Sequence, residues 1–210
     1  MATTTTNYGF DIPQSTDLVK DGATAIATLG QDIDTAMNTA LGTKKAGMVL
    51  LNTTSFSAVA SQSINSVFNA TYDNYRILTT ITSSSASDTV FLRLRASGTD
   101  DTSGNYNRTL VESNSGGVTN RYDSGATSLD ATVTHSPSAN GGGFSFDLER
   151  PFLSVWSVGL LNSAGRGSTG GWVGRAGGFI HSVATSYDGF TIFTTSGTIT
   201  GTVSVYGYNK

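Results

Sequence analysis

Three glycines come closest to a known ligand-binding motif in this sequence. Gly165, Gly167 and Gly170 have the G-x-G-x-x-G spacing that can hold the pyrophosphate of a dinucleotide. The motif binds phosphate only where it leaves a strand and opens a helix, whose N-terminus supplies the amide groups. Four more glycines follow within the next eight residues, and such a run disfavours a helix. We therefore expect a loop between two strands rather than a nucleotide site.

The histidines and glutamates are few and lie in no catalytic pattern. A zinc site built on His135 or His181 would need a further ligand at helical or hairpin spacing, and a serine triad would need a nucleophile elbow. Glu149 could form a glycosidase carboxylate pair with one of several aspartates, but no spacing selects the partner. We expect both histidines to be structural or solvated.

Residues 100–105, Asp-Asp-Thr-Ser-Gly-Asn, offer oxygen ligands but lack the spaced carboxylates and terminal glutamate of a calcium loop. The chain has no cysteine, which excludes a disulfide framework and a thiolate nucleophile. We expect no catalytic residue, no metal and no cofactor, and therefore no enzyme.

Four aromatic side chains lie near predicted loops, where they could bind a ligand. A ring exposed at a loop can stack on the face of a sugar, whereas a ring turned inward packs the rim of a sandwich. Both alternatives stay open for these candidate ligand-loop residues, which are Tyr106, Tyr122, Trp172 and Tyr187.

Charge and hydropathy exclude two classes of partner. The net charge is −3, and no basic run exceeds the pair Lys44–Lys45, so the chain lacks the footprint needed to neutralise nucleic-acid phosphates. No apolar run approaches the length of a membrane-spanning helix, and the first residues have no secretory-signal pattern. We expect neither nucleic-acid binding nor membrane insertion.

The pattern of a β-strand is clearest near the C-terminus. Ile199, Val203 and Val205 share one parity, and the hydroxyl side chains between them take the other. Such alternation is typical of a strand with one buried and one wet face. We expect this strand, which runs to Tyr208, to close a sheet with its apolar set in the core.

Ten or more short strands are predicted after Ala46. Turn signals recur every 8–15 residues, and strands do not alternate with helices. The sequence therefore predicts a mainly β fold in which residues 46–210 form an antiparallel β-sandwich or jelly roll. The other candidate strands are 48–51, 72–81, 89–95, 106–112, 118–122, 129–134, 143–149, 152–161, 171–184 and 188–195.

The sequence of residues 1–45 predicts an attachment arm followed by a helix. Residues 1–16 have the character of an extended arm, whose apolar side chains Tyr8, Phe10 and Ile12 dock on a partner or pack back on their own domain. Residues 17–41 contain apolar side chains at a seven-residue spacing.

The helical repeat places Ile26, Leu29 and Ile33 on one seam. This seam either packs between subunits, as in a homotrimeric stem, or packs on its own domain. A short Gly-Thr-Lys-Lys-Ala-Gly segment separates the helix from the strands, which favours packing between subunits.

Several segments resemble parts of tailed-bacteriophage virion proteins. The N-terminal segment from Thr6 to Pro13, with the Ala-rich helix after it, resembles the arms of fibre and minor structural proteins. A β-sandwich module that recurs in those proteins resembles residues 71–77, 92–99 and 196–208 of this chain.

The resemblance implies a homotrimeric, non-enzymatic appendage that is attached to other virion proteins by its N-terminus. It implies a location in the virion, after assembly in the host cytoplasm, without deciding between tail and head. A short fibre that presents its sandwich to a host-surface glycan is the leading hypothesis. A capsid decoration or head fibre protein without a host ligand is the alternative, and a polysaccharide-degrading enzyme is the third.

Overall fold

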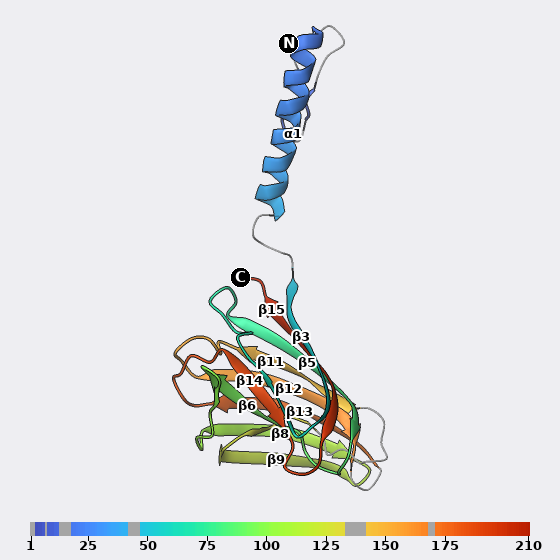
Figure 1. The fold of residues 1–210 in the computed structure, drawn as a ribbon, viewed down its shortest axis with the longest axis vertical. Coiled ribbons are helices and arrows are strands. Elements are labelled where there is room, and N and C mark those ends of the chain that lie inside the picture. The colour runs from blue at the N-terminus through green and yellow to red at the C-terminus, as the bar shows by residue number, and fades with distance from the viewer. Residues whose placement is uncertain (1–2, 7, 13–17, 42–46, 133–141, 168–170) are drawn as a thin grey trace. The chain divides into compact units, whose positions relative to one another are not determined.

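The computed structural model divides into two compact units, Met1–Gly47 and Met48–Lys210 (Figure 1). It describes residues 3–6, 8–12, 18–41, 47–132, 142–167 and 171–210. The first unit contains a helix and a short hairpin, and the described elements of the second are all strands. The expected fold class, mainly β with one helix and an antiparallel sandwich, is confirmed.

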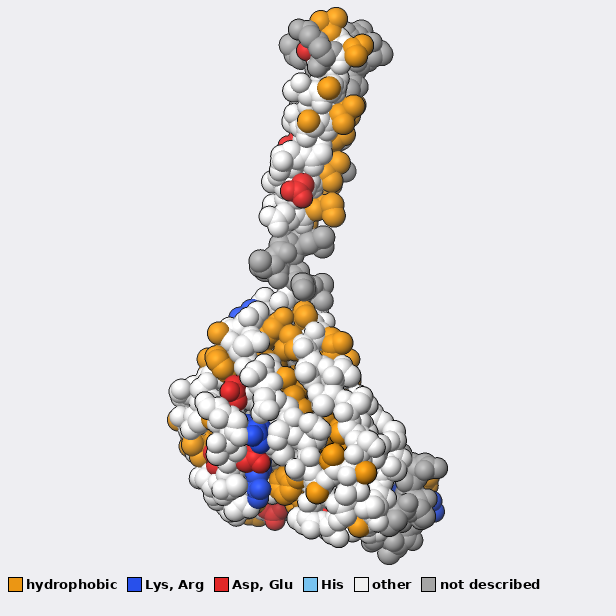
Figure 2. Space-filling model, viewed as in Figure 1, with side chains coloured by type: hydrophobic (Ala, Val, Ile, Leu, Met, Phe, Trp, Pro, Cys, Tyr) orange, Lys and Arg blue, Asp and Glu red, His pale blue; other side chains and the backbone are white. Residues whose placement is uncertain are grey.

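Helix α1 spans Val19–Leu41, within the range expected from the heptad spacing. Its apolar side chains at that spacing are exposed in this unit: Val19 is 95% exposed, Ile26 64% and Ile33 39%. Leu29 is half-buried. Apolar side chains follow one side of the unit in Figure 2. The helix therefore retains an apolar stripe that the described residues of its own unit do not cover fully.

The expectation of an extended arm is wrong for the described part of residues 1–16. Strands β1 (Thr3–Thr4) and β2 (Asp11–Ile12) pair as an antiparallel hairpin, and β2 contacts α1. The amide of Phe10 donates to the Thr5 hydroxyl at 2.9 Å, which tightens the turn. The hairpin folds back because its aromatic rings can then cover part of the apolar side of the helix.

The larger sheet of the second unit is antiparallel throughout. Its spatial order is β3-β15-β5-β11-β12-β13-β8-β9, so the C-terminal strand β15 lies between two others rather than at an edge. The eight strands are β3 (Met48–Val59), β5 (Asn74–Ser84), β8 (Tyr106–Asn114), β9 (Gly117–Ala126), β11 (Gly142–Glu149), β12 (Ser157–Arg166), β13 (Trp172–His181) and β15 (Ile199–Tyr208).

The smaller sheet has the order β10-β6-β14-β4, with β7 paired to β6. Its strands are also antiparallel. They are β4 (Ser61–Ile64), β6 (Phe91–Ala96), β7 (Thr99–Asp100), β10 (Leu129–Asp130) and β14 (Gly189–Phe193).

The core lies between the inner faces of the two sheets. Phe146 of β11, Leu92 of β6 and Ile192 of β14 are completely buried. Enclosing a large apolar side chain stabilises the fold by about 1.5–3 kcal/mol. Strand β15 alternates strictly between buried and half-buried residues, with Val203 and Val205 buried, so the expectation that its apolar set faces the core is confirmed.

The structure differs from the strand predictions in several places, of which two matter here. Residues 152–161 were expected to form one strand, but β12 begins only at Ser157. The residues before it form a turn, in which the amide of Leu153 donates to the carbonyl of Arg150 and Arg150 has a φ of +56°. Strand β4 was missed because its four residues are mostly polar and only Ile64 is fully buried.

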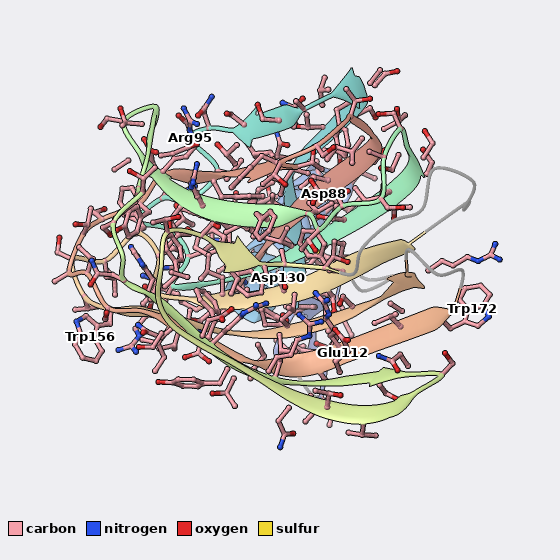
Figure 3. The ribbon with its side chains drawn as sticks, turned by 90° about the horizontal axis from the view of Figure 1, so that it is seen from below. Asp88, Arg95, Glu112, Asp130, Trp156 and Trp172 are labelled. Carbon is pink, nitrogen blue, oxygen red and sulfur yellow. The ribbon has the colours of Figure 1, made fainter. Side chains whose placement is uncertain are left out.

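A buried ionic network joins the two sheets on one side of the sandwich. The Nε of Arg175 in β13 donates to Glu112 of β8 at 2.7 Å, and its Nη1 donates to Asp130 of β10 at 2.7 Å. All three residues are at most 6% exposed, and Figure 3 shows Glu112 and Asp130 in the interior. Arg108 also pairs with Asp130, and Arg121 with Glu112. Each buried carboxylate thus faces two arginines.

We expect Arg175→Met to lower the free energy of unfolding by about 3–5 kcal/mol, because it leaves two buried carboxylates each short of a partner. The matched control is Arg76→Met, which removes an arginine from the half-exposed pair with Asp147. That pair should contribute less than about 1 kcal/mol. Urea unfolding of both variants measures the difference, and equal losses would contradict the role given to the buried network.

Candidate functional site

The outer face of the larger sheet is lined by small side chains across four adjacent strands. Directly paired residues on antiparallel strands share a face. Gly174 of β13 is paired with Ala164 of β12 on one side and Ser113 of β8 on the other. Ala176 is paired with Asn162 and Val111 in the same way. Because the side chains in these neighbouring strands are small, the middle of this face is hollowed.

Among the described residues, three hollows lie along this face. Two adjoining hollows of about 740 and 770 Å³ share Ser113, Ala164 and Gly174. A third, of about 370 Å³, continues along β8 and β13 past Thr109 and Gly178. We call them together the outer groove, whose main lining residues are Leu78, Thr80, Asn107, Thr109, Val111, Ser113, Tyr122, Gly143, Ser145, Asn162, Ala164, Trp172, Gly174, Ala176, Gly178 and Ile180.

Two glycines in the groove are not required by packing. A Cβ added at Gly174 would meet no atom closer than 3.9 Å, and one at Gly178 none closer than 3.7 Å. By contrast, a Cβ at Gly177, on the opposite face of the same strand, would lie 2.3 Å from the carbonyl oxygen of Thr109. Glycine inside a strand costs about 0.5–1 kcal/mol relative to alanine. At positions 174 and 178 the lack of a side chain leaves the groove open, and the fold bears this cost in stability.

Two of the four candidate aromatics border the outer groove. Trp172 is 76% exposed and Tyr122 is 72% exposed. Both lie on strands, within the candidate strands 118–122 and 171–184: Trp172 begins β13, and Tyr122 lies in β9 opposite Thr109. In Figure 3, Trp172 projects from one end of the β unit. A large exposed ring beside a groove is available to a ligand.

The other two candidate aromatics do not reach solvent, so their assignment to a ligand site is wrong. Tyr106 and Tyr187 are each 1% exposed. Tyr106 stacks on His181 with ring centroids 4.2 Å apart, and its hydroxyl donates to the carbonyl oxygen of Asp101. Burial raises the pKa of both tyrosines well above its usual range, and in Tyr187 the hydrogen bond to Asp101 raises it further.

These tyrosines belong to a buried polar cluster around His181. The Nε2 of His181 lies 3.0 Å from Asp101 Oδ2 and 2.7 Å from the hydroxyl of Tyr187. His181 is completely buried, so a substrate has no access to its ring. The structure therefore supports a structural role for His181. His135 lies outside the described residues.

The outer groove is uncharged along its lining. Arg108 and Arg175 contribute backbone to it, but their side chains point to the inner face and are at most 10% exposed. Asn162, Ser145 and Ser113 supply amide and hydroxyl groups between apolar side chains such as Val111, which is 46% exposed. The groove can therefore hydrogen-bond a neutral polar ligand while its aromatic side chains cover an apolar ligand face.

Metal binding finds no support among the described residues. No three of their His, Asp and Glu side chains are grouped so as to hold a metal ion. In the segment 100–105, Asp100 pairs with Arg95, and Asp101 accepts hydrogen bonds from Ser103 and Tyr187. Within the part of the chain that the structure describes, no helix is long and apolar enough to cross a bilayer.

Two carboxylates, of buried Glu112 and of partly buried Asp101, have pKa values that make stability depend on pH. Burial alone raises the pKa of Asp101 and of Glu112. Hydrogen bonds from Ser103 and Tyr187 to Asp101 outweigh burial, as do those from Arg175 and Arg121 to Glu112, and both pKa values fall below their usual range. In the unfolded chain these values are about 4. Both carboxylates therefore add stability above that pH and lose it as the pH falls.

We expect the free energy of unfolding to be nearly constant from about pH 7 to pH 5 and to decrease steadily below about pH 4. Thermal melts followed by circular dichroism measure this dependence. A melting temperature that stays constant or rises between pH 5 and pH 3 would contradict the assigned pKa directions.

No family model, no curated protein and no solved structure matches this chain. The outer groove and its two exposed aromatic side chains are therefore the features from which a function is inferred.

Proposed function

We propose that this chain is a short virion fibre whose β unit binds a host-surface glycan through the outer groove. One observation carries the binding role: Trp172 and Tyr122, each more than 70% exposed, border an uncharged groove lined with hydroxyl and amide groups. A sugar ring has an apolar face that stacks on an aromatic ring and polar edges that accept and donate hydrogen bonds. The groove offers both kinds of contact.

Other ligand classes fit the groove less well. Nucleic acid requires cations for its phosphates, and the arginines beneath the groove point inward and pair with carboxylates. A wholly apolar ligand would leave the side chains of Asn162, Ser145 and Ser113 without partners. A neutral, hydroxyl-rich ligand satisfies both conditions.

We expect Trp172→Ala and Tyr122→Ala each to weaken glycan binding about tenfold or more, because truncation of an exposed aromatic at a binding centre costs more than about 1.4 kcal/mol. Folding should be unaffected, since both rings are mostly in solvent. Retention on a glycan array and a thermal melt measure the two properties.

The matched control is Trp156→Ala. Trp156 is also exposed, at 56%, and Figure 3 shows it at the opposite end of the β unit from Trp172. It should bind like the wild type. Binding that is unchanged in the Trp172 and Tyr122 variants would contradict adhesion through this groove. It would favour the alternative function, a capsid decoration or head fibre protein with no host ligand.

The N-terminal unit is proposed to assemble and attach the fibre. The seven-residue spacing of Val19, Ile26 and Ile33 matches that of helices packed around a common axis, and threefold packing would remove this stripe from water. The attachment residues proposed are Tyr8, Phe10 and Ile12. Phe10 is half-buried, whereas Tyr8 is 75% exposed, so Tyr8 offers a partner more surface than Phe10.

We expect Ile26→Asp combined with Ile33→Asp to convert the oligomer to monomer, because like charges would face each other across the axis. The matched control is Gln31→Asp combined with Asn38→Asp, which adds the same charges at the same spacing on exposed positions away from the stripe. Sedimentation velocity distinguishes the species. A native oligomer in the first variant, or equal dissociation of both, would contradict assembly through this stripe.

A further inference from the structure

We infer that the outer groove binds an internal segment of an extended, uncharged polysaccharide, rather than a terminal sugar or an acidic one. This inference rests on the proposed function and specifies the ligand of the same site. Three properties of the groove support it: the distance between its two aromatic side chains, its open form and the absence of an outward charged side chain from its lining residues.

The distance between the aromatic side chains requires a ligand of several rings. Tyr122 is paired with Thr109, which is itself paired with Gly178, so Tyr122 lies level with Gly178 along β13. Trp172 lies six residues earlier on β13, or about 20 Å along the strand. Strand β9 is two strands away from β13, which adds about 10 Å across the sheet. One sugar ring is too short to contact both side chains.

The form of the groove favours a chain that continues beyond the site. A pocket for a terminal sugar encloses most of its ligand. The hollows of the outer groove instead lie on a sheet face and follow one another along β8 and β13. Gly174 and Gly178 lie on this path, where a larger side chain would stand in the way of the ligand. Within the described residues the path has no closed end that would select a terminal sugar.

The charged side chains that flank the lining positions in β8 and β13 are turned away from the ligand, whereas Arg166 lies on the outer face at one end of the groove, paired across the strands with Trp172. The guanidinium of Arg175 lies on the inner face, where Glu112 and Asp130 neutralise it. Arg108 pairs with Asp130 and Asp123 in the same interior. An acidic sugar between the two aromatic side chains would lose hydration without gaining a cation from the lining of the groove, which is unfavourable. The ligand that fits is neutral.

The test begins with a glycan array that includes neutral and acidic chains from disaccharides to octasaccharides. The expected hits are neutral chains, with affinity that rises more than tenfold from the disaccharide to the hexasaccharide in calorimetric titration of the hit series. Binding of acidic chains, or binding of a terminal disaccharide as tight as that of the longer chain that carries it, would overturn this inference and leave the proposed function standing. No binding to any glycan on the array would overturn both.

Two substitutions test the path of the ligand without removing a contact. Gly174→Val and Gly178→Val add side chains where the nearest atoms are 3.9 and 3.7 Å from a Cβ, so both variants should fold. Valine also favours strands, so the melting temperature should stay equal or rise. Affinity for the hexasaccharide should fall more than tenfold.

Alanine at the same positions provides the second variant and should fold in either case, with a smaller loss of affinity. The corresponding change on the inner face, Gly177→Ala, should destabilise the fold, because its Cβ has no room. Wild-type affinity in both valine variants would overturn the proposed path along β13.

Discussion

The bridge from Arg175 to Glu112 and Asp130 is the interaction on which the arrangement of this protein most depends. Arg175 and Glu112 are paired neighbours on β13 and β8, and Asp130 belongs to the other sheet. A slip of two residues would keep every apolar side chain on the inner face, but it would separate Arg175 from Glu112, so the paired buried charges are satisfied in one register only. The bridge thereby fixes both the register of the two strands and their distance from the smaller sheet.

The same alternation of side chains that turns these charges inward leaves the groove neutral. Arg175 lies between Gly174 and Ala176 in β13, and Glu112 lies between Val111 and Ser113 in β8. Each residue that faces the interior is therefore flanked by two that face the ligand side. A shift of one residue in either strand would expose charge in the groove and bury its small side chains. Stability and the character of the surface thus depend on one register.

The N-terminal unit leaves part of its apolar side chains exposed. The apolar side chains of its helix have too few contacts within the unit to be buried, and the hairpin covers only part of them. Val19 and Ile26 stay largely in solvent. An exposed apolar stripe of this regularity is unfavourable in an isolated chain and is removed when copies pack together. The β unit, by contrast, encloses its own core.

Local pattern alone determined the fold class, the helix and the alternation of the last strand, because periods of two and 3.6 depend only on neighbours in the chain. It determined neither the start of β12, which is set by the turn at Arg150, nor the short strand β4. It also gave no means of deciding which of the four candidate aromatic side chains face a ligand and which pack inward. Only the tertiary structure separated Tyr106 and Tyr187, which lie in the core, from Tyr122 and Trp172, which lie at the groove. The side of a sheet that becomes the interior is decided by the second sheet packing against it, and no local pattern records that contact.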